Sequence, residues 1–106
     1  MQITDIKVRK LFDEGPMKAV ISVTFDGQLA VHDIKVISAR DKFFIVMPSR
    51  KNPDNTYRDI IHPINSEFRQ LLESSVIDAY FAELRRQEEE GVMAAAEEGE
   101  VISADL

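Results

Sequence analysis

Apolar and polar residues alternate along the first third of the chain, as expected when each β-strand buries one face and exposes the other. Residues 3–11 show this alternation, and residues 17–25 show it more strictly, with five apolar side chains on one parity. Asp26-Gly27 follows directly, and Asp-Gly between two alternating segments is typical of a β-hairpin. We therefore expect residues 29–37 to form the third strand and to return beside the second.

Two irregularities interrupt the strand pattern after this hairpin. Val31 and Ile34 fall on opposite parities, which predicts a β-bulge between residues 32 and 33. Residues 38–42 are expected to form a loop, and the continuous apolar run of residues 43–47 is typical of a strand covered on both faces. The second cover would be either a helix or a partner subunit, and the sequence leaves both open.

A polar segment joins this strand to the C-terminal part of the chain. Residues 48–57 contain a turn signal at Pro53-Asp54-Asn55, so we expect a loop here. A short fifth strand is predicted at residues 57–61, and Pro63 argues against its continuation as a central strand.

Beyond the loop the spacing of apolar residues changes from two to three and four, which predicts an amphipathic α-helix. Asn65 or Ser66 is suited to cap its start, Glu67 complements the helix dipole, and Gly91 is the expected stop. The apolar stripe is most simply core, and its alternative role is a dimer seam. The positions that define the helix are Phe68, Leu71, Leu72, Ser75, Val76, Ala79, Tyr80 and Leu84.

These elements together define an α+β fold, in which a small antiparallel sheet of about four to five strands is followed by a C-terminal amphipathic helix. The folded domain is expected to span residues 1–90. Residues 91–106 carry scattered acids without apolar periodicity, so we interpret them as an acidic disordered tail. A domain of this length buries a modest fraction of its surface, and dimer formation would add to its stability.

The composition excludes several classes of protein. The 106 residues are 44% hydrophobic and 30% charged, as in globular domains, and contain no cysteine for disulfides, thiolate metal sites or a nucleophile. No apolar run is long enough to cross a bilayer, and we expect no secretory signal. The net charge of −6 arises in the tail, because residues 1–86 hold all 13 basic residues against 12 acids. A local basic patch on the domain is therefore compatible with a polyanionic partner.

The polar loop is the most unusual stretch of the sequence, because Arg50, Lys51 and Arg58 lie in or beside it and two prolines stiffen it. Adjacent basic side chains on a preformed loop can neutralise neighbouring phosphates at a small entropic cost. The simpler interpretation is a solvated loop in which Arg58 pairs with a neighbouring aspartate. Further basic side chains occupy exposed strand positions, where they either extend a basic face or are only solvated: Lys7, Arg9 and Lys18.

The chain resembles the septation regulator family, also called stage V sporulation protein G, from its first residue to about Leu84. The resemblance is carried by Ile3-Thr4-Asp5-Ile6, by residues 31–37 (VHDIKVI), and above all by the long and idiosyncratic block of residues 47–65. One departure is Asn55, where the family usually has glycine. Asparagine tolerates the left-handed conformation better than most residues, so we expect the turn to be kept.

This resemblance implies a bacterial, cytoplasmic and dimeric protein that is linked to septum formation, sporulation and gene regulation. It also implies sequence-preferring binding of DNA or RNA. The family's basic loop residues correspond here to Arg50 and Lys51, and its Tyr-Arg-Asp-Ile segment corresponds to residues 57–60. Side chains whose chemistry suits base contacts are Asn52, Asn55 and Tyr57.

The two histidines are expected to make hydrogen bonds at strand ends. His32 precedes Asp33 and His62 follows Asp59 by three residues, but a zinc site needs three or four ligands and the chain has no cysteine. A catalytic pair would need a nucleophile or a pocket, and the sequence has no glycine-rich phosphate loop. We therefore expect no metal, no cofactor and no catalysis.

The sequence thus predicts a non-enzymatic homodimer that binds DNA or RNA through its basic loops, with Arg50, Lys51 and Arg58 as contact residues. Arg50 and Lys51 are expected to act as an adjacent pair, repeated by the two-fold axis of the dimer. The main alternative is a regulator of septum formation that acts through division or regulatory protein partners, without direct contact to nucleic acid. An enzyme is a distant third hypothesis.

Overall fold

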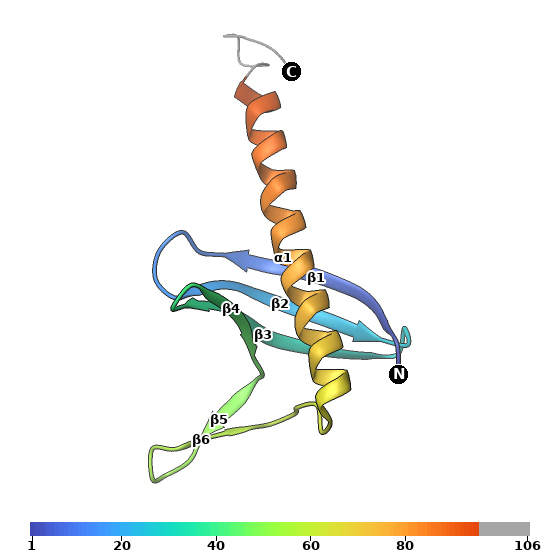
Figure 1. Cartoon of the computed structure of the whole chain (residues 1–106), viewed down its shortest axis with the longest axis vertical. Coiled ribbons are helices and arrows are strands. Elements are labelled where there is room, and N and C mark those ends of the chain that lie inside the picture. Colours follow the sequence, from blue (N-terminus) through green and yellow to red (C-terminus); the bar gives the residue numbers. More distant parts are fainter. Residues whose placement is uncertain (96–106) are drawn as a thin grey trace.

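The computed structural model describes residues 1–95, which form six strands and one helix. Figure 1 shows the helix crossing a sheet, with a separate two-stranded hairpin below it. The sheet is antiparallel, and its strands in spatial order are β1 (Ile3–Leu11), β2 (Met17–Phe25), β3 (Leu29–Ala39) and β4 (Lys42–Val46). The hairpin consists of β5 (Ser49–Lys51) and β6 (Tyr57–Asp59), and the helix α1 spans Ser66–Ala95. The predicted α+β fold is confirmed.

The β2–β3 hairpin is closed by the predicted turn, in which Asp26 and Gly27 adopt left-handed φ angles of 54° and 62°. The predicted bulge is also present in β3. The register with β2 shifts there, so that His32 and Asp33 together oppose Ser22, and Asp33 takes a φ of 66°. The extra residue keeps the apolar side chains before and after it on the same face of the sheet.

Several strand boundaries differ from the prediction. β4 covers residues 42–46 instead of 43–47, and β6 ends at Asp59 instead of at residue 61. β3 continues to Ala39, and a tight turn at Arg40 and Asp41, both with left-handed φ angles, replaces the loop expected at residues 38–42. Residues 49–51, which were expected to lie in a loop, form β5. They are polar and few, so no alternation marks them, and they become a strand because β6 follows after a short turn and supplies the pairing partner.

The helix begins where the sequence predicts it. The side-chain Oδ1 of Asn65 accepts the backbone N–H of Phe68 at 2.7 Å, which is the hydrogen bond of an N-cap. The predicted stop at Gly91 is wrong, because α1 continues to Ala95. One glycine inside a helix costs only about 1 kcal/mol, so it does not by itself end one. The rest of the expected tail, residues 96–106, lies outside the described residues.

The core lies between α1 and one face of the sheet. Leu72, Val76 and Tyr80 follow at four-residue spacing and are only 1%, 0% and 5% exposed. Leu71 was expected on this stripe but is 49% exposed, because it lies about 100° around the helix from Leu72. Leu84, one turn after Tyr80, is also exposed. The sheet buries Ala19, Ile21, Val23, Phe25, Val31, Ile34, Val36 and Ile45, and Met47 follows.

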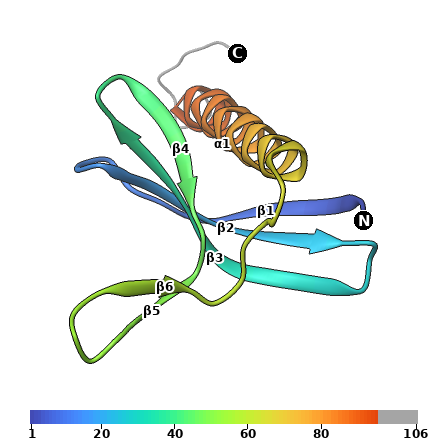
Figure 2. The same cartoon turned by 60° about the horizontal axis from the view of Figure 1, so that its bottom comes forward.

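β4 is an edge strand, and only one of its faces is covered within the described chain. Phe43 packs against the rings of Tyr80 and Phe81, at centroid distances of 6.0 and 4.9 Å. The next side chain, Phe44, points to the opposite face and is 37% exposed. Figure 2 shows α1 on one side of the sheet, and no other element within residues 1–95 packs on the opposite side. We call this uncovered side the open face.

Candidate nucleic-acid interface

The β5–β6 hairpin projects from the body of the protein (Figures 1 and 2). Among the described elements, β5 and β6 contact only each other. The backbone N–H of Ile60 donates to the carbonyl of Pro48 at 2.8 Å, which extends the pairing toward the base of the hairpin. The hairpin is therefore a thin ribbon, and nearly all of its side chains are available to a partner.

A closed network of hydrogen bonds fixes the turn at the tip. Asp54 Oδ1 accepts the N–H of Thr56 at 3.1 Å and its hydroxyl at 2.6 Å. These bonds hold the pKa of the Asp54 carboxyl below its usual range, with the hydroxyl of Thr56 as the largest cause. Asn55 adopts a φ of 70°, which confirms that asparagine keeps the left-handed turn. The tip is thus shaped before any ligand arrives.

The strand register sets which basic side chains lie together. Arg50 pairs directly with Arg58, and Lys51 pairs with Tyr57. Paired residues of a two-stranded ribbon share a face, whereas consecutive residues point to opposite faces. The expected adjacent pair of Arg50 and Lys51 is therefore split between two faces. A cross-strand pair of Arg50 and Arg58 takes its place.

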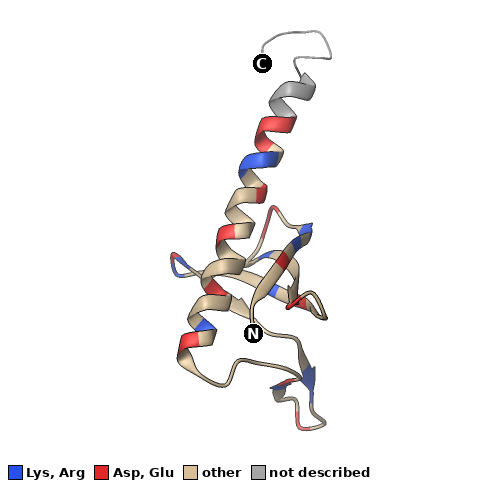
Figure 3. Cartoon of the chain, turned by 90° about the vertical axis from the view of Figure 1, so that its right-hand side faces the viewer, with Lys and Arg blue, Asp and Glu red and all other residues tan. Residues whose placement is uncertain are grey.

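This arginine pair has an unbalanced charge. Within the described side chains, residues 1–90, the ion pairs are those of Arg86 with Glu83 and with Glu90, so the predicted pairing of Arg58 with an aspartate is not seen. Asp54 bonds Thr56 instead. Figure 3 shows the basic strands of the hairpin in blue and the acidic tip in red. Like charges placed directly opposite each other destabilise a hairpin, and a bound anion between them reverses that effect.

The two faces of the hairpin are not fully separate sites. A shallow hollow of about 510 Å³ is lined by Arg50, Lys51, Asn52, Pro53 and Asn55, so one ligand can touch both basic residues. Tyr57 is 69% exposed and offers an aromatic ring for base stacking. The Asn52 amide donates to the Thr56 hydroxyl at 3.1 Å. Of the proposed base-contacting side chains, Asn55 and Tyr57 are thus the better placed.

Both histidines make hydrogen bonds as expected, but neither lies at a strand end: His32 lies at the bulge inside β3, and His62 follows the end of β6 by three residues. His32 Nδ1 lies 2.8 Å from Ser22 Oγ, and His62 Nδ1 lies 3.0 Å from the carbonyl oxygen of Pro63. Among the residues that the structure describes, no group of three histidine, aspartate or glutamate side chains is suited to hold a metal ion. His62 lines a pocket of about 380 Å³, but none of its lining residues is acidic. The His-carboxylate arrangement that the enzyme hypothesis requires is therefore not found around this histidine.

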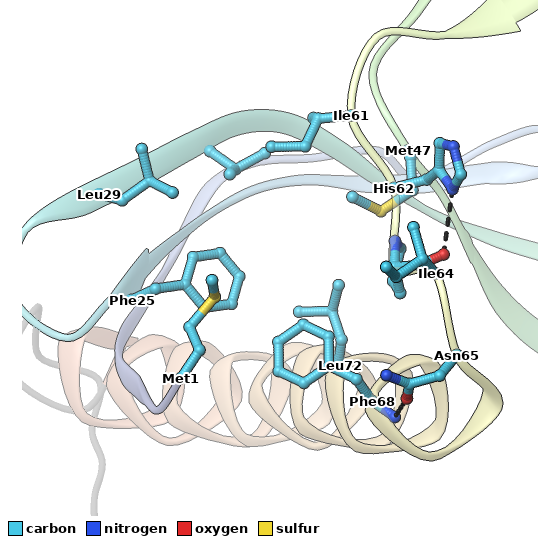
Figure 4. A pocket seen from close by; sticks show the side chains of 12 residues that line it. Met1, Phe25, Leu29, Met47, Ile61, His62, Ile64, Asn65, Phe68 and Leu72 are labelled. Atoms are coloured by element: carbon cyan, nitrogen blue, oxygen red, sulfur yellow. Dashed lines mark hydrogen bonds between the residues drawn. The ribbon is translucent and has the colours of Figure 1, made fainter.

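The same pocket reveals an apolar surface that the sequence reading missed. It lies between the end of the β2–β3 hairpin and the start of α1, and Figure 4 shows Phe25, Met47 and Leu72 lining it. Large apolar side chains around it are exposed, and Ile64 is 89% exposed. The signal was Ile60-Ile61-x-Pro-Ile64, which has no strand or helix period and sits in a polar stretch. We call the exposed apolar side chains that line this pocket the apolar patch: Met1, Leu29, Ile61 and Ile64.

Within the described residues, no helix is both long enough and apolar enough to span a bilayer. The fold and the site thus define a small α+β domain with a projecting cationic hairpin next to an exposed apolar patch.

The sequence model of the SpoVG family matches residues 1–82. Septation protein SpoVG of Acetivibrio thermocellus, by its assigned name, is 55% identical over 80 residues, which cover 76% of this chain and 85% of the relative. The protein of the same name from Caldanaerobacter subterraneus is 56% identical, over 76% of this chain and 88% of the relative. That of Clostridium beijerinckii is 52% identical, over the same shares of the two chains. The chain belongs to the SpoVG family.

Proposed function

We propose that this protein is a bacterial regulator of the septation and sporulation type that binds DNA or RNA through the β5–β6 hairpin. The family name of its relatives supports the link to septation. The observation that carries nucleic-acid binding is the cross-strand pair of Arg50 and Arg58, which has no acidic partner among residues 1–90. Phosphate oxygens are the natural partners of such a pair, because guanidinium groups bind them bidentately. Lys51 and Tyr57 add a charge and a stacking surface on the other side.

The apolar patch supports a second part of the proposal, that the protein acts as a homodimer. Ile64 and Met1 are 89% and 71% exposed in the single chain, which is unfavourable for a free surface in water. The patch adjoins the base of the hairpin, so a second copy seated there would bring two hairpins into one assembly. Such a homodimer is proposed to act in the cytoplasm, without cofactor and without catalysis.

A competing function uses the same patch for a division or regulatory protein, with no nucleic acid involved. The two functions differ in their response to salt. Binding of a polyanion releases counterions and weakens steeply as salt rises, whereas an apolar interface does not.

The decisive experiment measures binding of labelled DNA and RNA, single-stranded and duplex, by fluorescence anisotropy over a series of salt concentrations. The double variant Arg50→Ala with Arg58→Ala is expected to bind more weakly. If each arginine contacts one phosphate, the slope of log K against log salt should decrease by about 1.8 for a duplex and about 1.4 for a single strand. A matched control, Arg69→Ala with Arg85→Ala, removes the same charge from α1. Equal binding by the two double variants would refute the hairpin as the contact site.

Self-association is tested separately by sedimentation velocity. Ile64→Glu places a charge in the centre of the patch at a side chain that contributes little to the monomer core. We expect a dimer for the unaltered chain and a monomer for the variant. A monomeric unaltered chain, or a variant that still dimerises, would contradict this use of the patch.

A further inference from the structure

The open face of the four-stranded sheet carries a second group of basic side chains, well separated in sequence from the hairpin. Lys7 pairs with Ser22, and Val20 pairs both with Lys10 and with Lys35. Ser22 and Val20 alternate with the core residues of β2, so they and their partners face away from α1. Three lysines from two strands, Lys7, Lys10 and Lys35, therefore lie on the open face.

Arg9 joins this group through a hydrogen-bonded chain that spans three strands. Arg9 Nε donates to Ser22 Oγ at 3.2 Å, and Ser22 Oγ lies 2.8 Å from His32 Nδ1. Because the arginine can only donate, the serine hydroxyl is free to donate its own proton to the imidazole nitrogen. Ser22 is only 6% exposed, so it is a buried anchor that orients the two exposed groups beside it.

The hydrogen-bonded series of Arg9, Ser22 and His32 contains no acidic partner for its basic groups. Arg9 and His32 are both exposed residues, and neither Arg9 nor the lysines form an ion pair within residues 1–90. Acids do occur nearby: Asp5 lies opposite Thr24 at one end of the face, and Asp33 lies with His32 in the bulge opposite Ser22, in the same row as Lys7. The neighbouring row of Lys10, Val20 and Lys35 contains no acid and is cationic.

The other end of the open face is apolar. Ile37 pairs with both Met17 and Phe44, so these three side chains form one row across β2, β3 and β4. Phe44 is 37% exposed, and its ring is accessible from the open side. A row of cations beside an exposed aromatic ring on the face of a sheet is the combination that binds single strands, with phosphates on the cations and a base stacked on the ring.

We propose that the open face is a second contact surface for nucleic acid and that it takes a single strand rather than a duplex. Phosphates lie over Arg9 and the three lysines, and a base stacks on Phe44. A single strand is favoured because stacking on Phe44 requires an unpaired base. This inference rests on the proposed function, since it assumes a nucleic-acid partner, but it uses a surface that shares no residue with the hairpin.

The test compares labelled oligouridylate with an RNA duplex of equal length, by anisotropy over a range of salt. The open-face variant Lys7→Ala, Arg9→Ala, Lys35→Ala should lose single-strand affinity, with a salt slope smaller by about 2 if three phosphate contacts are removed. Its duplex affinity should fall no more than that of a control that removes three charges elsewhere: Arg40→Ala, Arg69→Ala and Arg85→Ala. Ser22→Ala changes no charge and should still lower single-strand affinity, because it releases Arg9 and His32.

The outcomes separate this inference from the proposed function. If the unaltered protein binds neither polymer, both fall. If it binds but only substitution of Arg50 and Arg58 weakens binding, the hairpin function stands and the open-face inference is refuted. The same variants are examined by sedimentation, because a change in self-association with no change in single-strand affinity would show that the open face contacts a second copy instead. Circular dichroism of each variant establishes that the fold is retained.

Discussion

The cross-strand arginine pair gives the sharpest prediction, because its effects on stability and on binding should have opposite signs. Arg58→Glu places a carboxylate directly opposite Arg50 in the β5–β6 register. The substitution replaces a repulsive pair with an attractive one, so the hairpin should become more stable. At the same time it removes one of the two arginines that we propose bind phosphate and adds a negative charge, so affinity for nucleic acid should fall.

The size of the stability effect follows from the geometry. Directly opposite residues have Cβ atoms about 5 Å apart, and cross-strand charge pairs contribute roughly 0.2–1 kcal/mol in exposed hairpins. Coulomb's law in bulk water gives about 0.8 kcal/mol for unit charges at 5 Å, so reversal of one sign changes the pair energy by at most about 1.6 kcal/mol. Flexible side chains and salt reduce this value. We expect about 0.5–1 kcal/mol, which lowers the population of the open hairpin by about twofold to fivefold.

Amide hydrogen exchange measured by NMR reports this population directly. Two hairpin amides are suited to the measurement, because the N–H of Asn52 donates to Thr56 at 2.7 Å and that of Ile60 donates to Pro48 at 2.8 Å. Both should exchange more slowly in Arg58→Glu, while amides of the four-stranded sheet are unchanged. Arg58→Gln should give a smaller effect. Faster exchange in Arg58→Glu would show that Arg50 and Arg58 do not face each other, and the electrostatic argument for the site would fail.

Three further predictions concern the fold. Tyr80→Ala should lower the free energy of unfolding by about 3 kcal/mol, because Tyr80 is only 5% exposed in the core. Urea denaturation measures this loss, and an unchanged midpoint would mean that the helix phase is wrong. Asn65→Ala should cost about 1 kcal/mol through loss of the N-cap, whereas the neighbouring Ser66→Ala should cost less, and equal losses would contradict the assignment of the cap. The pKa of Asp54 is lowered by hydrogen bonds from Thr56, so the turn is stabilised above the unfolded value of 3.8 and loses this contribution as the pH falls through the lowered folded pKa. The Thr56 amide shift followed by NMR should report this transition, and a pH-independent shift would contradict it.

Much of the sheet was predictable because its signals are local. Asp26-Gly27 specifies a tight turn by backbone conformation alone, and the parity change between Val31 and Ile34 reveals the bulge without knowledge of the partner strand. The start of α1 was equally predictable, since Asn65 caps the first turn through its own side chain. Each of these features depends on residues only a few positions apart in the chain.

The features that the sequence did not reveal depend on contacts between segments. β5 is a strand only because β6 pairs with it, and the register that places Arg50 opposite Arg58 depends on the number of residues in the turn. The loop interpretation therefore paired Arg50 with its chain neighbour, Lys51, whereas the register pairs it with Arg58. Similarly, the exposure of Leu71 depends on how α1 is rotated on the sheet, which the helical period alone does not fix.

The contact between α1 and β4 limits how the protein can assemble. The carboxylate of Glu73 accepts the backbone N–H of Ile45 at 3.0 Å, and that N–H lies on the outer edge of the sheet. A strand from another molecule would have to displace this carboxylate to continue the ladder. Glu73 thus caps this border of the sheet, and it disfavours growth of the sheet by a strand from another copy.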